Sequence, residues 1–222
     1  MIHACVFDLD GTLLNSLKDI ANSTNYALAH NGYQPCPVDQ YRSFVGDGLE
    51  VLIRRVLGPN YTTEAGILLV NDFNFYYGSH YSEFTLPYNG VPELLQSLLA
   101  HGLKLAVLSN KPDGFVKVII KELFPDTDFT VIQGKTDKFA HKPDPASLEN
   151  VMRELGVKTG ETLYIGDSDI DIHTAHNAKL KAVGVTWGFR ERSELEAAGA
   201  DYIVDSPEDI LKLVYNIDRL GS

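Results

Sequence analysis

Two carboxylates near the N-terminus are the first side chains whose types and spacing suggest chemistry. Asp8 and Asp10 lie at the end of the apolar run Ala4–Leu9 and precede Gly11-Thr12. Because side chains two apart on a strand point the same way, both carboxylates can face one site. At about 4 Å they would repel by roughly 4 kcal/mol at an effective dielectric constant of 20, so a proton or a cation must offset them. Gly11 permits a sharp turn, and the amides after it suit an anion. The alternative is a polar strand end that meets water.

Two further segments carry groups that suit phosphate oxygens. Ser109 and Asn110 follow the apolar segment Leu103–Leu108 and offer a hydroxyl and an amide, although the same pair also suits a helix cap. Lys142 is followed by two prolines within three residues, which stiffen the backbone and hold the lysine in place. Its ammonium is a compact charge that suits phosphate, and the alternative is a solvated lysine.

A second acidic segment follows the strand-like run Thr162–Ile165. Asp167, Asp169 and Asp171 place three acids within five residues. Carboxylate oxygens of this kind suit Mg²⁺. Acids at a helix N-terminus explain Asp169 and also fit Asp171. They explain Asp167 less well, because it ends the strand. The four groups together, in this order, favour a functional site more than any one of them does alone.

Short apolar runs that alternate with helical patterns must position these residues. The clearest helix begins at Pro145 and ends before Gly156. This alternation predicts an α/β fold with a Rossmann-like parallel sheet core and helices on both faces. At the carboxyl ends of such strands the polar segments can converge. The predicted strands are Ala4–Leu9, Leu103–Leu108, Phe129–Ile132, Thr162–Ile165, Ala182–Val185 and Tyr202–Val204.

The region from Ser16 to Glu83 contains only helical signals. Predicted helices span Leu17–His30, with Ser16 as a candidate cap, Leu49–Leu57 and Thr63–Tyr77. We interpret this region as an inserted α-helical cap domain. The predicted division is a core of residues 1–15 and 86–222 and a cap of residues 16–85.

At this point the chain resembles the haloacid dehalogenase-like hydrolase superfamily over nearly its whole length. The superfamily's four motifs are similar to Phe7-Asp8-Leu9-Asp10-Gly11-Thr12-Leu13, Ser109, Lys142, and Gly166-Asp167-Ser168 with Asp171. The helical insert resembles that superfamily's cap. Within it the chain looks most like the phosphoglycolate phosphatases, in the segments Phe44–Gly48, Leu108–Pro112, His141–Pro145 and Val183–Gly188.

The resemblance implies a phosphatase mechanism. Asp8 would be the nucleophile that forms an aspartyl-phosphate. Asp10 would protonate the departing alkoxide and then activate water. Ser109 and Lys142 would bind the transferring phosphoryl group, with Gly11, Thr12 and Asn110 as further binding candidates.

The resemblance also implies a Mg²⁺ cofactor. The ion would be held by the Asp8 side chain, the Asp10 carbonyl and Asp167, with Asp171 supporting the site. Such an ion would offset the repulsion between the carboxylates.

Selection of the substrate is expected to come from the cap. Between Asp19 and Leu103 the only lysines or arginines are Arg42, Arg54 and Arg55. Arg54 or Arg55 is the predicted contact for a second anionic group, and the alternative is a solvated helix arginine. Six aromatic residues crowd the stretch 73–84, either as cap core or as a ring that faces the substrate.

Composition limits the partners. The 222 residues carry 19 Lys and Arg against 30 Asp and Glu, a formal net charge of −11, and a pI near 5.0. Such acidity argues against nucleic acid and anionic membranes. Two cysteines make no disulfide framework, and no run is long enough for a signal peptide or a membrane span. We therefore expect a cytoplasmic monomer or homodimer that acts on a small phosphorylated metabolite. The alternatives are a phosphosugar mutase or pyrophosphatase of the same superfamily, or a non-catalytic phosphoacceptor module.

Overall fold

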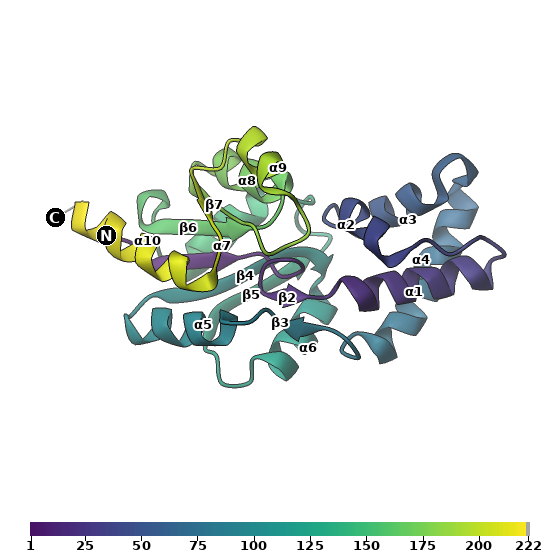
Figure 1. Cartoon of the computed structure of the whole chain (residues 1–222), viewed down its shortest axis with the longest axis horizontal. Helices are drawn as coiled ribbons and strands as arrows, with labels where there is room; N and C mark the ends of the chain where they lie inside the picture. The colour runs from purple at the N-terminus through teal and green to yellow at the C-terminus, as the bar shows by residue number, and fades with distance from the viewer. Residues whose placement is uncertain (221–222) are drawn as a thin grey trace.

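A six-stranded parallel sheet forms the centre of the larger part of the molecule, in a computed structural model that describes residues 1–220 (Figure 1). The strand order is β5-β4-β1-β6-β7-β8, so the N-terminal strand lies in the middle. All six predicted strands are present, with ends shifted by up to a few residues. Their bounds are β1 (Ala4–Phe7), β4 (Lys104–Pro112), β5 (Phe129–Lys135), β6 (Thr162–Gly166), β7 (Lys181–Val185) and β8 (Tyr202–Val204).

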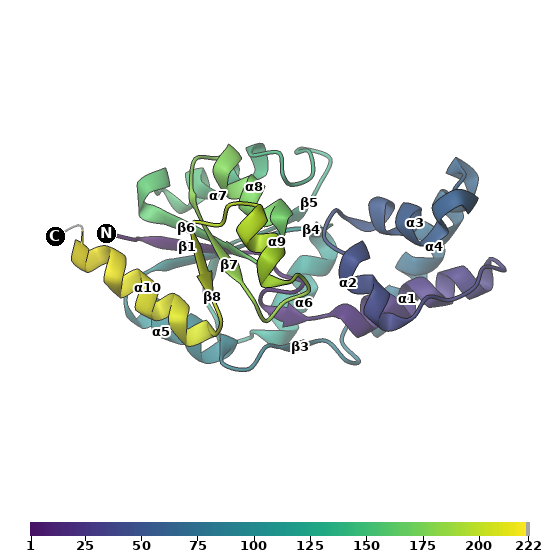
Figure 2. The ribbon, with the colours of Figure 1, turned by 45° about the horizontal axis from the view of Figure 1, so that its top comes forward.

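Helices cover both faces of this sheet, as Figure 2 shows. Alternate residues of β1 enter two separate apolar clusters, since Cys5 and Phe7 join one and Ala4 and Val6 join the other. Burial on both sides is typical of parallel strands between helical layers. The α/β prediction is therefore confirmed. The first cluster includes α5 (Val91–Ala100), α6 (Asp113–Leu123) and α10 (Pro207–Leu220), and the second includes α7 (Ala146–Leu155), α8 (Asp169–Asn177) and α9 (Arg192–Ala197).

A group of helices between β1 and β4 stands at one end of the sheet (Figure 1). Two of them have the predicted bounds, and α4 runs one turn beyond the predicted Tyr77. The elements are α1 (Leu17–His30), α2 (Tyr41–Phe44), α3 (Leu49–Leu57) and α4 (Thr63–His80), with short 3₁₀ turns at Val38–Gln40 and Gly58–Asn60. No helix in the described range 1–220 is long and apolar enough to cross a membrane.

Two chain passages connect this helical cap to the core. They pair as a short antiparallel ribbon of β2 (Leu14–Asn15) and β3 (Leu86–Pro87). The buried carboxylate of Asp19 in α1 accepts hydrogen bonds from the backbone amides of Phe84 and Thr85, which ties the first cap helix to the returning chain. We propose the ribbon as the boundary between the two predicted domains.

Ser16 does not cap α1 as predicted. It occupies the N-cap position but makes no side-chain capping hydrogen bond. Its hydroxyl instead donates to Asp10 Oδ1 at 2.5 Å. A carboxylate is the stronger acceptor, so the side chain serves the polar edge of the sheet rather than the helix.

Candidate active site

The carboxyl ends of three neighbouring strands place the predicted residues at one edge of the sheet. Asp8 follows β1, Ser109 lies near the end of β4, and Asp167 follows β6. Because β1 lies between β4 and β6, Asp8 is central. Lys142 reaches the same place from the loop before α7, where its ammonium lies 2.8 Å from Asp8 Oδ1. Segments that are remote in the sequence therefore meet at the crevice where open α/β sheets bind ligands.

Three buried carboxylates converge at this point. Asp8, Asp167 and Asp171 each offer an oxygen, and these oxygens lie within 4.8 Å of one another. Burial raises the pKa of Asp8 to about 7, although the ammonium of Lys142 acts in the opposite direction. Burial, followed by the charges of Asp171 and Asp8, raises the pKa of Asp167 to about 8. Because each raised pKa reports a carboxylate that is costly to ionise, and because the donors are hard oxygens, this set fits a divalent cation such as Mg²⁺.

Asp167 is held in one orientation by its neighbours. Its Oδ2 accepts the backbone amide of Phe189 at 2.7 Å, and its Oδ1 accepts the hydroxyl of Thr12 at 3.2 Å. Two glycines make room for it: an added Cβ would lie 2.3 Å from Asp167 Oδ2 at Gly11 and 2.3 Å from Asp167 Cβ at Gly188. Gly11 also has a φ of +89°, which side chains rarely adopt. The loop Trp187–Phe189 thus belongs to the site, a part that the sequence analysis did not assign.

Lys142 joins two of the carboxylates. Its Nζ lies 2.8 Å from Asp8 Oδ1 and 2.8 Å from Asp171 Oδ1, and it donates to the hydroxyl of Tyr164 at 3.0 Å. Burial would lower the pKa of Lys142, but Asp171 and Asp8 raise it well above the ordinary lysine value, so the ammonium stays charged. Asp171 Oδ2 accepts from the amide and hydroxyl of Ser168. Both oxygens of Asp171 are therefore engaged, which suits a supporting role.

Asn110 and Ser109 have different environments although they are adjacent. Asn110 donates to the backbone carbonyls of Gly46 and Lys142 and accepts the amide of Lys142 at 2.8 Å. Its amide group thus holds the lysine segment and contacts a cap loop. Ser109 lines the cavity described below. The geometry leaves the hydroxyl of Ser109 as the freer of the two for a phosphate oxygen.

Lys111 is a site residue that the sequence analysis did not single out. Its Nζ lies 3.0 and 2.9 Å from the two oxygens of Asp10, and its side chain is only 7% exposed. The same Asp10 carboxylate accepts from Ser16. The signal was the position of Lys111 directly after Ser109-Asn110, but the sequence does not show that residues 101 positions apart pair.

A cavity lies between the core and the cap. Its empty volume is about 550 Å³. The core supplies its polar residues and the cap supplies mostly apolar side chains. The lining consists of Asp8, Asp10, Ile20, Val45, Gly46, Gly48, Leu49, Leu52, Phe73, Tyr77, Ser109, Asn110, Lys111, Pro112 and Phe115.

The structure brings neither predicted cap arginine into this lining. The guanidinium of Arg54 lies over the ring of Tyr61, 4.4 Å from its centroid. Arg55 forms an ion pair with Asp47 at 2.6 Å. Both arginines are exposed, whereas the buried residues of α3 are Leu52, Ile53 and Leu57. Their contact with a substrate stays a prediction that the contacts seen here do not favour.

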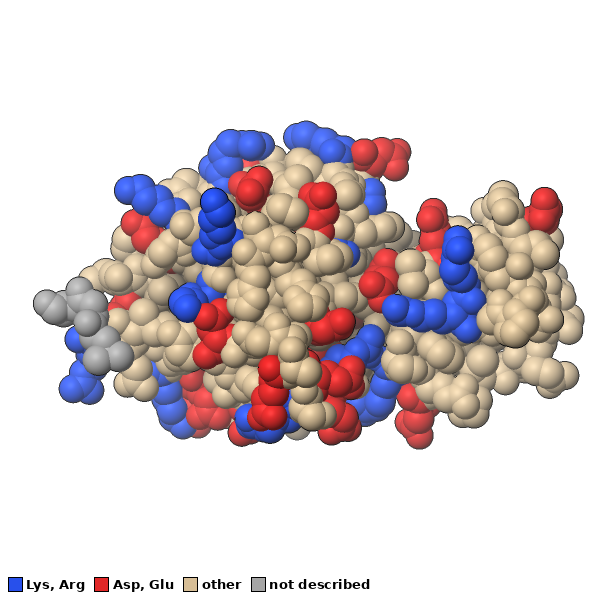
Figure 3. Space-filling model, turned by 90° about the horizontal axis from the view of Figure 1, so that it is seen from above, with Lys and Arg blue, Asp and Glu red and all other residues tan. Residues whose placement is uncertain are grey.

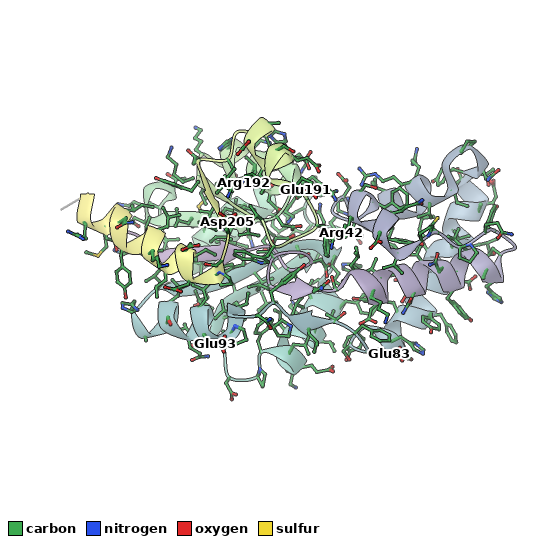
Figure 4. All side chains as sticks on the ribbon, viewed as in Figure 1. Arg42, Glu83, Glu93, Glu191, Arg192 and Asp205 are labelled. Carbon is green, nitrogen blue, oxygen red and sulfur yellow. The ribbon has the colours of Figure 1, made fainter. Side chains whose placement is uncertain are left out.

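A different arginine joins the cap to the core. Arg42 of α2 donates to the carbonyl of Gly188 at 3.1 Å, and in Figure 4 it lies at the junction of the two parts. From the core side, Arg190 donates to the carbonyl of Val45 in the cap at 2.9 Å.

Figure 3 shows acidic and basic side chains interspersed over the face of the core that it presents, with no continuous basic area on that face.

Residues 5–185 match the haloacid dehalogenase-like hydrolase family. The chain belongs to this family. The predicted resemblance is therefore confirmed, and the parallel sheet with a helical cap agrees with the fold of its members.

Several named members of the family are similar to this chain over nearly the whole length of both chains. A phosphoglycolate phosphatase from Mannheimia succiniciproducens is 35% identical over 94% of this chain and 96% of its own. One from Vibrio parahaemolyticus is 33% identical over 96% of each chain. The solved structure of a predicted phosphoglycolate phosphatase from Haemophilus somnus has a TM-score of 0.88 at 31% identity and covers 96% of this chain and 98% of its own.

Proposed function

We propose that the protein is a Mg²⁺-dependent phosphatase that hydrolyses a small phosphomonoester such as 2-phosphoglycolate through an aspartyl-phosphate. That it is a phosphoric monoester hydrolase follows from its family and from its named relatives. The observation that carries the finer proposal is the central Asp8, which lies beside a buried ammonium and a second carboxylate and opens onto the cavity.

In the first step, a carboxylate oxygen of Asp8 attacks phosphorus, and the bond between phosphorus and the ester oxygen breaks. Asp10 gives its proton to that oxygen, which leaves as an alcohol. Both residues line the same cavity, as this step requires. The ammonium of Lys142 and the hydroxyl of Ser109 bind phosphoryl oxygens as negative charge develops there.

In the second step, Asp10 accepts a proton from a water molecule whose oxygen attacks the phosphorus on Asp8. Inorganic phosphate leaves and the Asp8 carboxylate is restored. Ser16 and Lys111 both contact the Asp10 carboxylate and orient it for these transfers.

Mg²⁺ is proposed at the carboxylate cluster, where Asp8, the carbonyl of Asp10 and Asp167 would hold it. Asp171 would support this site through Lys142 and Ser168. When bound, the ion supplies positive charge to the phosphoryl oxygens and to the repelling carboxylates.

The substrate class rests on the names of the relatives together with the shape of the cavity. The cavity volume of about 550 Å³ includes space that is open to solvent, so the cavity suits only a metabolite of a few carbon atoms. On the face that Figure 3 shows, the interspersed charges give no support to a nucleic acid partner. A cytoplasmic location and a monomeric or homodimeric state remain predictions from the sequence.

A panel of phosphomonoesters, phosphosugars and pyrophosphate tests this proposal, with Mg²⁺ and with excess chelator. We expect release of inorganic phosphate from 2-phosphoglycolate with Mg²⁺ and loss of that activity with chelator. Activity that survives chelation would contradict the metal role. Transfer of phosphate between sugar positions without release would select a mutase, and turnover of pyrophosphate alone would select a pyrophosphatase.

A further inference from the structure

The two ends of the cavity differ in what they can bind. The phosphoryl end is occupied by Asp8 and its partners, so the rest of the substrate must extend toward the cap. There the wall is largely apolar, with Ile20 of α1, Leu52 of α3 and Phe73 of α4. A polar group on the substrate would lose water in this space unless the wall supplied partners for it.

Tyr77 of α4 supplies one such partner. The residue is fully buried and lines the cavity, and its hydroxyl lies beside the Lys111 ammonium. Burial raises the pKa of Tyr77, and the charge and hydrogen bond of Lys111 act in the opposite direction. Because an ammonium can only donate, the proton of this hydroxyl has no acceptor among residues 1–220, and a buried donor without an acceptor is costly. A ligand group that accepts a hydrogen bond from this hydroxyl would provide one.

Lys111 supplies the second partner. Among residues 1–220 it is the only lysine or arginine that lines the cavity. Its Nζ lies against both oxygens of Asp10 and 4.8 Å from the centre of the Tyr77 ring. An ammonium has three donors, so one remains after the two contacts with Asp10, and it faces the Tyr77 hydroxyl. A core cation and a cap hydroxyl therefore stand side by side.

The other polar groups nearby are already engaged. Asn110 uses its amide to hold the backbone of Lys142 and Gly46. Arg54 and Arg55 lie against Tyr61 and Asp47, outside the lining.

We propose that Lys111 and Tyr77 form a subsite that binds a carboxylate at the end of the substrate remote from the phosphate. This inference rests on the proposed phosphatase function and names the groups that select its substrate. Because Lys111 contacts Asp10, and Asp10 must reach the ester oxygen, the carboxylate lies within a few bonds of that oxygen. The subsite thus favours short phosphooxy-carboxylates. It is complete only when the cap covers the core, because Tyr77 comes from the cap.

The experiment compares 2-phosphoglycolate with ethyl phosphate, which has a methyl group in place of the carboxylate. For the wild type we expect kcat/KM to favour 2-phosphoglycolate by about tenfold or more, as for a hydrogen-bonded charged group. Tyr77→Phe and Lys111→Met should each lower this ratio by about tenfold. Tyr61→Phe, a cap tyrosine outside the lining, is the matched control and should leave the ratio unchanged.

The outcomes separate the two proposals. A ratio that stays within about twofold of the wild-type value in both variants would overturn the subsite. Equal kcat/KM values of the wild type for ethyl phosphate and 2-phosphoglycolate would also overturn the subsite, while the phosphatase function would stand. A wild type that hydrolyses neither ester with Mg²⁺ removes the proposed function and the subsite with it. If Lys111→Met does not fold, Tyr77→Phe, which removes one oxygen atom, decides.

Discussion

The two walls of the cavity are built on different principles. On the core side, Asp8 lines the cavity, and behind it the buried ammonium of Lys142 contacts both Asp8 and Asp171. On the cap side, the lining within residues 1–220 is apolar apart from one hydroxyl, that of Tyr77. A network of fixed charges is suited to a step in which charge develops. A sparse apolar wall is suited to choosing between leaving groups. Chemistry and selection are therefore divided between the two parts of the chain.

The largest expected effect is at the centre of the core wall. Asp8→Asn should lower kcat by more than about 10⁴-fold, because the amide cannot act as the nucleophile. The fold should persist, because Asp171 still pairs with the buried ammonium of Lys142. Steady-state kinetics and thermal unfolding check this. Asp169→Asn, in the second acidic segment but outside the lining, is the control, and substantial activity in Asp8→Asn would refute the mechanism.

A smaller effect is expected at the proposed metal ligand. Asp167→Asn should weaken Mg²⁺ binding by about 10- to 100-fold and lower activity accordingly, with partial recovery at high Mg²⁺. Calorimetric titration of Mg²⁺ measures this change directly. In the wild type, Mg²⁺ at about 100 times its dissociation constant should add about 2.7 kcal/mol to the free energy of unfolding. The absence of any Mg²⁺-dependent stabilisation would count against the site.

The glycines around Asp167 give a third, more modest effect. Gly188→Ala should destabilise the protein by about 1–3 kcal/mol, because a Cβ there would meet Asp167 and the carbonyl of Gly11. Gly78→Ala in α4 is the matched change, with open space around its Cβ. It should stabilise the protein by about 0.5–1 kcal/mol. Denaturant unfolding measures both changes in the free energy of unfolding. Equal changes in the two variants would show that Gly188 is not packed closely against Asp167.

The smallest effect is expected on the outer side of the cap. Arg54→Ala and Arg55→Ala should each change kcat/KM for 2-phosphoglycolate by less than about twofold, because neither side chain lines the cavity. Kinetic assays of these two variants and of Tyr77→Phe under the same conditions provide the comparison. A selective rise in KM for anionic esters in either arginine variant would restore the sequence-based prediction and would weaken the division described above.

The contrast between the two walls also explains what the sequence could predict. Six strands and the helices Leu17–His30 and Leu49–Leu57 follow from local periodicity and were predicted with nearly correct bounds. Asp8 and Asp167 could be singled out because each ends a strand. The pairing of Lys111 with Asp10, and of Ser16 with the same carboxylate, arises only from tertiary packing.

The orientation of the aromatic side chains in the cap also could not be predicted from the sequence. The aromatic stretch around Tyr77 predicted either cap core or a ring that faces the substrate, and the sequence offered no way to choose. The structure shows that Phe73 and Tyr77 are buried and line the cavity, whereas Phe75 is exposed. Helical periodicity assigns neighbouring aromatics to opposite faces, but only the packed structure shows which face meets the core.

The most direct test of the central claim is to trap the phosphorylated enzyme. The protein is mixed with 2-phosphoglycolate and Mg²⁺, quenched in acid within one turnover, digested, and analysed by mass spectrometry. The account predicts that the peptide with Asp8 gains one phosphoryl group, and that the Asp8→Asn protein shows no such gain. A phosphoryl group on another residue, or turnover by the Asp8→Asn protein at the wild-type rate, would contradict it.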